Sequence, residues 1–431
     1  MNRLHRERCF PGYRSGEYNG SAAPKQRAQE GFITMRRPRI LVGIGAALGT
    51  AVIVSSAFFV GIVAAAPQKA AGNSVSFEHA CGAAAAGFAQ CHAILRVNGK
   101  PGGGGSPSGL NPSDLQSAYK LSATGGNGQT IAIVDAYDDP NAETDLGVYR
   151  AKFGLSSCTT ANGCFRKTDQ TGGTNYPRGN TGWAEEISLD IDMASAICPN
   201  CHILLVEASS NSFANLLAAD DYAASQTSWI SNSWSGGESS GEGSYDSHFN
   251  KSGKVFTFAT GDSGYGAQYP ATSPYVVAVG GTSLKKASNS RGWTETAWSG
   301  AGSGCSAYES QPSWQSGNAN ITSVCGKRAE ADISAIGDPN TGVSVYDTFR
   351  ESGWLVFGGT SVATPIIASV YALANNAGTV GGNASYLYSH TSSYFDVTSG
   401  SNGNCGSLLC NATSGWDGPT GLGTPNGTGG F

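Results

Sequence analysis

The sequence predicts an α/β domain with a mainly parallel sheet and helices on both of its faces. Two observations support this fold class. Short, almost wholly apolar segments alternate with longer segments of helical periodicity, and strands of a parallel sheet are apolar throughout because both of their faces are buried. In addition, acidic or glycine residues end several of these segments, as is common at the carboxyl ends of strands that carry a site.

The predicted elements follow one another from residue 110 onward. Strands are expected over 129–138, 202–208, 228–234, 255–264 and 275–282. Helices are expected near 142–153, 183–197, 212–225 and 361–375. No internal repeat is visible, and residues 98–109, NGKPGGGGSPSG, have the composition of a flexible linker.

The segment that precedes this domain predicts export. Residues 40–66 are uncharged and apolar, and Arg36, Arg37 and Arg39 come before them, which is typical of a secretory signal cleaved near Ala65. The stretch is also long enough to span a bilayer, so an anchor at the outer face of the membrane is the alternative. We therefore divide the chain into a leader or anchor (1–66), a short propeptide or spacer (67–109) and a main domain (110–431).

Charge excludes one class of partner. The 431 residues carry a formal charge of −5, but nine of the 26 basic residues lie within 1–66. The rest of the chain is therefore strongly acidic, which argues against nucleic acid as a partner.

Ten of the eleven cysteines fall into close pairs, and Cys9 lies in the predicted leader. An even number of paired cysteines in an exported chain predicts local disulfides. The alternative is a zinc site, since Cys198, Cys201 and His202 have ligand-like spacing, but no second cluster completes a tetrahedral set. The five predicted bonds are Cys81–Cys91, Cys158–Cys164, Cys198–Cys201, Cys305–Cys325 and Cys405–Cys410.

The segment 358–365, GGTSVATP, places Ser361 at the start of a predicted helix. Thr360 is the expected cap of that helix. A serine at such a turn exposes its hydroxyl beside backbone N–H groups that can receive an oxyanion. It becomes a nucleophile only when another group takes its proton, and an ordinary turn is the alternative.

No histidine stands out as that group, whereas two carboxylates do. In the predicted helix 183–197, WAEEISLDIDMASAI, Glu186 and Asp190 are four residues apart and share one face. Two adjacent carboxylates in a half-buried site share a proton, and such a pair can accept a serine proton and return it. The alternative is a solvated acidic face, because Glu185 and Asp192 lie on the same helix.

A third acid, Asp262, follows an apolar strand in the sequence GDSG at 261–264. Aspartate beside glycine most often forms a turn. A protonated Asp262 could instead donate a hydrogen bond to an oxyanion.

Taken together, these motifs resemble the sedolisins, the serine-carboxyl peptidases. The similarity covers roughly residues 110–431 and rests on EISLD, on GDSG with YPATSPYVVAVGGT, on GGTSVATP, and on the tail segments YFDVTSG and SGWDGPTGLGTPNG. It implies a subtilisin-like three-layer domain. It also implies that Ser361 is the nucleophile, Glu186 the general base and acid, Asp190 its partner, and Asp262 an oxyanion group, working in acid.

The resemblance also implies one structural Ca²⁺ ion in a loop region at the C-terminal end. Asp396 and Asp417 match side-chain ligands of the family, and the carbonyls of Val397, Thr413 and Gly415 match backbone ligands. All are hard oxygen donors, as calcium requires. An Asx turn at each aspartate is the alternative.

Two further residues are inferred from their positions. Asp135 ends the first predicted strand, where it could extend the series Ser361, Glu186 and Asp190. It could also serve a subtilisin-type Ser/His/Asp site with an unrecognised histidine. Trp234 could form a wall of the same pocket, and the loop 235–247 is expected to shape specificity.

We therefore expect a secreted, monomeric serine-type endopeptidase that acts on proteins or peptides through an acyl-enzyme. A membrane partner follows only if the leader is retained. The alternatives are a non-catalytic surface binding module of the same fold and the subtilisin-like Ser/His/Asp peptidase.

Overall fold

In the computed structural model of the chain, residues 75–97, 102–103 and 106–431 are described. The predicted leader, residues 1–66, and much of the predicted linker lie outside this part. All described residues belong to one compact unit. Within it, every helix is too short or too polar to cross a membrane.

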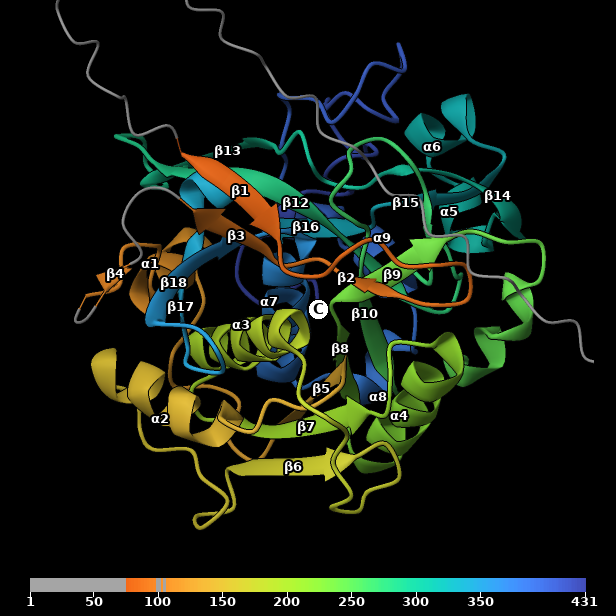
Figure 1. Ribbon diagram of the computed structural model, residues 1–431. Helices are drawn as coiled ribbons and strands as arrows, with labels where there is room; N and C mark the ends of the chain where they lie inside the picture. The colour runs from red at the N-terminus through yellow and green to blue at the C-terminus, as the bar shows by residue number, and fades with distance from the viewer. Residues whose placement is uncertain (1–74, 98–101, 104–105) are drawn as a thin grey trace, which may run out of the picture. The chain divides into compact units, whose positions relative to one another are not determined.

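An eight-stranded sheet runs through the centre of this unit (Figure 1). The strand order is β13-β12-β10-β8-β5-β7-β6, and β16 pairs with β12. Every pairing is parallel except that of β12 with β13, so the predicted mainly parallel sheet is confirmed. The strands are β5 (Thr130–Ala136), β6 (Phe165–Asp169), β7 (His202–Ala208), β8 (Trp229–Asn232), β10 (Val255–Ala259), β12 (Val277–Lys286), β13 (Trp293–Ala297) and β16 (Ile333–Ile336).

Helices cover both faces of this sheet. Alternate residues of its strands point to opposite sides, so each set packs against different helices. Ile131 and Ile133 of β5 pack with residues of helices α3 and α7, whereas Ala132 and Val134 pack with residues of α4. The predicted three-layer arrangement is therefore confirmed. The longer helices are α1 (Pro112–Ala118), α2 (Ala142–Lys152), α3 (Thr181–Ile197), α4 (Phe213–Gln226) and α7 (Thr360–Ala374).

Two predicted strands end earlier than the apolar pattern suggests. The stretch predicted as a strand over 228–234 breaks at Ser233, after which β9 (Trp234–Gly237) leaves the main sheet. Strand β9 pairs instead with β2 (Gln90–Cys91) and β11 (Gln268–Tyr269). The predicted strand 255–264 ends at Ala259, which leaves the GDSG sequence in a loop beyond the sheet.

The N-terminal segment packs on the main domain through a second sheet. Its strands β1 (Ser76–His79), β3 (Ile94–Val97), β18 (Gly353–Gly358) and β17 (Val343–Asp347) lie in that order, and β4 (Gly102–Gly103) pairs with β18. Residues 75–97 are thus integrated with the core. Their role as a propeptide or spacer stays a prediction.

Short elements complete the described part. They are β14 (Gly304–Ser310), β15 (Lys327–Glu330), β19 (Tyr394–Phe395) and β20 (Thr424–Pro425), with the helices α5 (Ser313–Ser316), α6 (Ala319–Val324), α8 (Ala377–Val380) and α9 (Ser385–Tyr388). All five predicted disulfides are formed. The zinc alternative is wrong, because Cys198 and Cys201 are bonded to each other.

Candidate active site

Three neighbouring strands end at the same edge of the main sheet. Asp135 is the penultimate residue of β5, Ser233 follows β8, and Asp262 follows β10 by three residues. Because β8 pairs in parallel with both β5 and β10, their carboxyl ends meet at one edge, where sites form in open α/β sheets. The topology thus gathers polar groups that are far apart in the sequence.

Helix α7 brings Ser361 to this edge as its second residue. The preceding Gly359 has a φ of 104°, which favours glycine. A Cβ at this position would lie 1.8 Å from the His92 carbonyl oxygen and 2.7 Å from Oδ2 of Asp262. The Ser361 hydroxyl donates to the Ser233 carbonyl oxygen at 3.3 Å, so the nucleophile of the prediction lies at the end of β8.

Asp262 lies at the N-terminus of the same helix. Its Oδ1 accepts hydrogen bonds from the backbone N–H of Thr360 at 2.8 Å and from the Thr360 hydroxyl at 2.9 Å. The expected capping by Thr360 is therefore wrong: Thr360 is the donor, and the acid caps the helix from another loop. Oδ2 of Asp262 is buried and has no hydrogen-bond partner among the described residues.

Helix α3 supplies the two acids of the predicted pair. Glu186 and Asp190 are both fully buried. Oε2 of Glu186 accepts from the backbone N–H of Ala93 at 2.7 Å, and Oδ1 of Asp190 accepts from the Ser233 hydroxyl at 2.9 Å. Glu185 and Asp192 are buried as well, so the alternative of a solvated acidic face is wrong.

The electrostatics favour the protonated forms of these carboxyls. Burial raises the pKa of Glu186 well above its usual range, and the nearby Asp135 raises it further, while the neighbouring Ser361 hydroxyl acts in the other direction. Burial, Asp135 and Glu186 raise the pKa of Asp190 in the same way. No lysine, arginine or histidine of the described residues forms an ion pair with either acid. The pair therefore holds protons at pH values where exposed carboxyls have lost them.

The two supporting residues of the prediction are placed differently. Asp135 is fully buried beside the pair, and burial raises its pKa to about 8. Trp234 does not wall the pocket. Its fully buried indole donates to the Val134 carbonyl oxygen at 3.0 Å and packs edge-on against Phe258 in the hydrophobic core.

None of the described histidines hydrogen-bonds to Ser361 or Asp135. The ring of His92 forms a hydrogen bond with the Ser235 hydroxyl. The ring of His248 bonds Asp221, and the ring of His390 bonds Ser389 and the Tyr386 carbonyl. The carboxylates, rather than an imidazole, are thus the groups that face the serine.

Two participants were missed from the sequence. The Ser233 carbonyl accepts a hydrogen bond from the Ser361 hydroxyl, and the Ser233 hydroxyl donates one to Asp190. Its only sequence signal is a serine at the end of an apolar strand. Ala93, which contacts Glu186, lies in a segment predicted as a spacer, and nothing local marks it.

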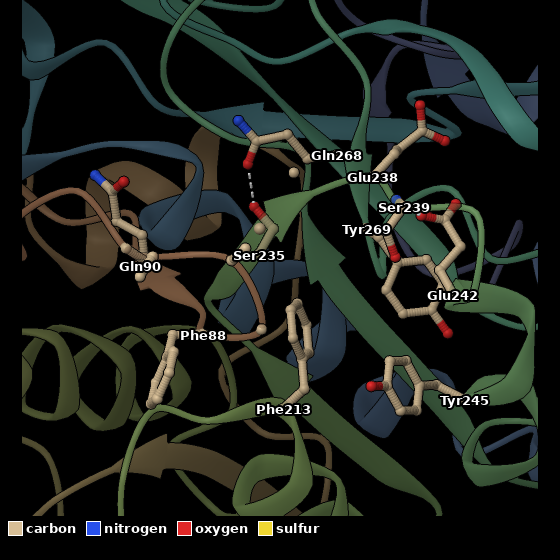
Figure 2. A pocket seen from close by; sticks show the side chains of 16 residues that line it. Phe88, Gln90, Phe213, Ser235, Glu238, Ser239, Glu242, Tyr245, Gln268 and Tyr269 are labelled. Atoms are coloured by element: carbon tan, nitrogen blue, oxygen red, sulfur yellow. Dashed lines mark hydrogen bonds between the residues drawn. The ribbon is translucent and has the colours of Figure 1, made fainter.

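A cavity of about 380 Å³ lies beside β9. Figure 2 shows Phe88 and Gln90 on one side, Glu238 and Glu242 on the other, and Phe213 between them, with its ring stacked on that of Tyr245. Part of the loop 235–247, which the sequence predicted to shape specificity, therefore lines this cavity. Phe213 also packs against the ring of Trp234.

The predicted calcium ligands converge on residues 413–417. Oδ2 of Asp396 accepts from the Gly415 N–H at 3.0 Å, and Oδ2 of Asp417 accepts from the Thr413 N–H at 2.9 Å. Burial raises the pKa of Asp417 to about 7, and Asp396 adds to this shift. The two carboxylates are therefore close enough to repel each other.

Two carbonyls of this loop are hydrogen-bonded to a side chain, whereas the predicted ligand carbonyls are not. The carbonyls of Ser414 and Trp416 accept from the amide of Asn320. No hydrogen bond from a described residue reaches the carbonyls of Val397, Thr413 or Gly415. Among described residues no three His, Cys, Asp or Glu side chains form a metal site. The donor set that remains is two carboxylates and free carbonyls, which fits a calcium ion.

Comparisons with known proteins give a consistent result. The model of the subtilase family (Peptidase_S8) matches residues 172–393, just over half of the chain. Kumamolisin from Bacillus sp. (strain MN-32) is 31% identical over 363 residues, which are 75% of this chain and 63% of the relative. Sedolisin from Pseudomonas sp. (strain 101) is 28% identical over 386 residues, 78% of this chain and 63% of the relative. The chain thus spans less than two thirds of the length of these relatives.

A solved structure shares the fold. It is that of Pseudomonas sedolisin, described as a serine-carboxyl proteinase in complex with two molecules of pseudo-iodotyrostatin. The TM-score is 0.63 at 28% identity, over 75% of this chain and 96% of that chain.

Proposed function

This chain belongs to the subtilase family, within its sedolisin group, and from that membership we propose that it is a secreted serine-carboxyl endopeptidase that hydrolyses proteins in acid. The observation that carries the proposal is a buried carboxyl pair, paired with no cation of the described residues, that lies beside Ser361: the Ser361 hydroxyl donates to the Ser233 carbonyl, and the Ser233 hydroxyl donates to Asp190.

The chemistry begins with proton transfer from Ser361. When the proton that the pair shares lies on Asp190, the ionised Glu186 takes the hydroxyl proton as Oγ attacks the scissile carbonyl carbon, and Glu186 then gives that proton to the leaving amine. Water releases the acyl-enzyme by the reverse transfers. Asp190 and Asp135 act through Glu186, because their raised pKa values keep a proton in the group.

Asp262 stabilises the oxyanion of the tetrahedral intermediate. Burial raises the pKa of Asp262 to about 7, although the two hydrogen bonds from Thr360 act to lower it. In acid the carboxyl is therefore protonated, and its unpartnered Oδ2 can donate to the developing negative charge. Loss of that proton at neutral pH would turn a donor into a repelling charge, which accounts for an acidic optimum.

We assign the donor set of the C-terminal loop region to a structural Ca²⁺ ion. Asp396 and Asp417 would hold it together with the carbonyls of Val397, Thr413 and Gly415. When bound, it would offset the repulsion between the two carboxylates and stabilise the loop. The Cys405–Cys410 disulfide closes the chain between the two ligand segments.

Secretion and a monomeric state complete the proposal. The five disulfides fit an oxidising compartment. The apolar stretch 40–66 serves as the signal, and its retention would anchor the enzyme at the outer face of the membrane.

Ser361→Ala tests the proposal. We expect kcat/KM on a denatured protein at pH 4 to fall at least about 10⁴-fold, because nothing else can form the acyl-enzyme. Ser369→Ala is the matched control, since Ser369 lies two turns further along α7, is fully buried and bonds only to the Pro365 carbonyl. Retained hydrolysis by Ser361→Ala would refute the proposal.

A further inference from the structure

The loop that carries Asp262 lies against a second loop further along the chain. Residues 260–266 (the oxyanion loop) follow β10, and residues 298–303 (the connector) join β13 to β14. Three backbone hydrogen bonds link the two loops, from Gly302 to Gly261, from Gly264 to Gly300 and from Gly266 to Ser303, at 2.7, 2.9 and 2.7 Å. The position of the oxyanion loop therefore depends on that of the connector.

The side chain of Asn402 holds the connector. It is almost fully buried, and its Nδ2 donates to the Ala301 carbonyl oxygen at 2.6 Å and to the Ser303 hydroxyl at 2.7 Å. Both partners are acceptors, because the Ser303 hydroxyl uses its own proton for the Leu409 carbonyl oxygen at 2.6 Å. One amide nitrogen thus ties together two residues of the connector.

The backbone of Asn402 contacts the oxyanion loop itself. Its carbonyl oxygen accepts from the Tyr265 N–H at 2.9 Å. At Gly264, where φ is 74°, a Cβ would lie 2.5 Å from that same oxygen. Glycine is therefore required for this close approach. Asn402 supports the oxyanion loop both directly and through the connector.

The segment around Asn402 is closed on itself. The Asn402 N–H donates to the Cys410 carbonyl oxygen at 3.0 Å, and Cys410 is bonded to Cys405. At the base of the segment, the Ala412 N–H donates to the Gly400 carbonyl oxygen at 3.0 Å. The support is thus fixed independently of the oxyanion loop.

Helix α7 holds the other side of the oxyanion loop. The Thr360 hydroxyl accepts from the Gly261 N–H at 3.2 Å, and Thr360 also bonds Oδ1 of Asp262. The backbone N–H groups of Gly264 and Tyr265 go instead to the connector and to Asn402. The direction of the unpartnered Oδ2 of Asp262 therefore depends on both supports.

From these contacts we infer that Asn402 is a positioning residue of the active site, which holds the oxyanion loop so that Asp262 points at the oxyanion. The inference rests on the proposed peptidase function. It predicts an effect on turnover rather than on substrate binding, because neither the oxyanion loop nor the connector lines the 380 Å³ cavity beside β9. A displacement of about 1 Å is enough to cost roughly a hundredfold in rate.

Asn402→Ala in the full chain tests the inference, with a fluorogenic peptide as substrate at pH 4. We expect kcat to fall about 30- to 100-fold and KM to change by less than about threefold. Ser401→Ala is the matched control. Its exposed hydroxyl bonds only Gly403 among the described residues, so this variant should keep the wild-type constants.

The pH profile of kcat separates positioning from a loss of folded protein. Burial raises the pKa of Asp262 to about 7, and the acid that interacts with it, Glu186, lies on α3 and is untouched by the substitution. A loosened loop admits water to Asp262, which lowers its pKa. We therefore expect the alkaline limb of kcat in Asn402→Ala to move about one pH unit lower. A smaller folded fraction would leave that limb in place.

Gly264→Ala changes the same junction and leaves the amide of Asn402 intact. Its Cβ would push the oxyanion loop away from the Asn402 carbonyl oxygen, so we expect a similar loss in kcat and a similar shift of the alkaline limb. Because both substitutions break one junction, the double variant should lose little more than either single variant.

Several results would overturn the inference and leave the proposed function standing. They are an unchanged kcat in Asn402→Ala, a change in KM alone, an unmoved alkaline limb, and losses that add in the double variant. An Asn402→Ala chain that does not fold would also overturn it, because the residue would then serve the fold as a whole. A wild-type chain without hydrolytic activity would overturn both the inference and the proposed function.

Discussion

Two sites with buried carboxyls in this protein differ in the charge of the neighbouring side chains. Asp332 is fully buried beside Arg328, whose guanidinium nitrogens lie 2.9 and 2.5 Å from its two oxygens. The Tyr388 hydroxyl adds a further bond at 2.9 Å. Glu186 and Asp190 are equally buried, but the charged groups around them are other acids.

This difference in charge distinguishes a carboxyl with a structural role from carboxyls that can transfer a proton. A buried carboxylate that has a cation and several donors remains an ion pair and fixes the packing around it. A buried carboxyl surrounded by acids keeps a proton, which it can give and take back. Burial is the same in both groups, so the presence of the arginine decides the role.

The largest effect should come from Glu186→Gln. The amide keeps the size of the side chain and can still bond Ala93, but it cannot accept the serine proton. We expect kcat/KM at pH 4 to fall at least about 10³-fold, with an unchanged unfolding temperature. Glu185→Gln, one residue away on α3 and also buried, is the control and should retain activity. Equal losses in both variants would mean that Glu186 is only one of several structural acids.

Asp332→Asn should act on stability instead. It leaves the guanidinium of Arg328 buried without its counter-charge, which costs about 3–5 kcal/mol in the free energy of unfolding. Denaturant titration measures this loss. As a control, Asp221→Asn removes a half-exposed partner of His248 and Lys251 and should cost less than about 1 kcal/mol. Similar losses from the two substitutions would show that the buried ion pair contributes no more to the free energy of unfolding than the half-exposed one.

A smaller effect should appear in the pH dependence of stability. Burial raises the pKa of Asp135 to about 8 and that of Asp262 to about 7 in the folded chain. The folded state then binds more protons than the unfolded state, so the free energy of unfolding falls as pH rises toward these values. His92, whose pKa burial lowers to about 3, acts in the opposite direction but only below its unfolded value of 6.5.

The window from pH 6.5 to 8 therefore isolates the acids. In Ser361→Ala, which lacks the proposed nucleophile, we expect the unfolding temperature to drop by roughly 5 °C across this window. Asp135→Asn should reduce the drop. A temperature that is constant or rises with pH would show that these carboxyls are ionised in the folded state.

Much of the fold could be read from local patterns. Apolar runs located β5, β7 and β12, because a strand buried on both faces needs apolar residues throughout. The i, i+4 spacing placed Glu186 and Asp190 on one face of α3, since helical geometry is fixed by the backbone. The same patterns put Ser361 at the start of α7.

Other features had no local signal. The split at Ser233 depends on β9 finding partners in β2 and β11, which lie far away in the sequence. The position of Trp234 follows from the same pairing. Alternate residues of β9 face opposite sides, so the pairing of β9 with β2 and β11 directs the indole into the core.

The sequence by itself determined which residues could do the chemistry: one serine at the start of a helix, two acids one turn apart, and one acid after a strand. Only the tertiary structure decided that the acids of α3 are buried, that no cation of the described residues pairs with Glu186, and that Ser233 connects Ser361 with Asp190. The physical reason is that secondary structure follows from neighbouring residues, whereas burial and proton affinity follow from segments that meet only when the chain has folded.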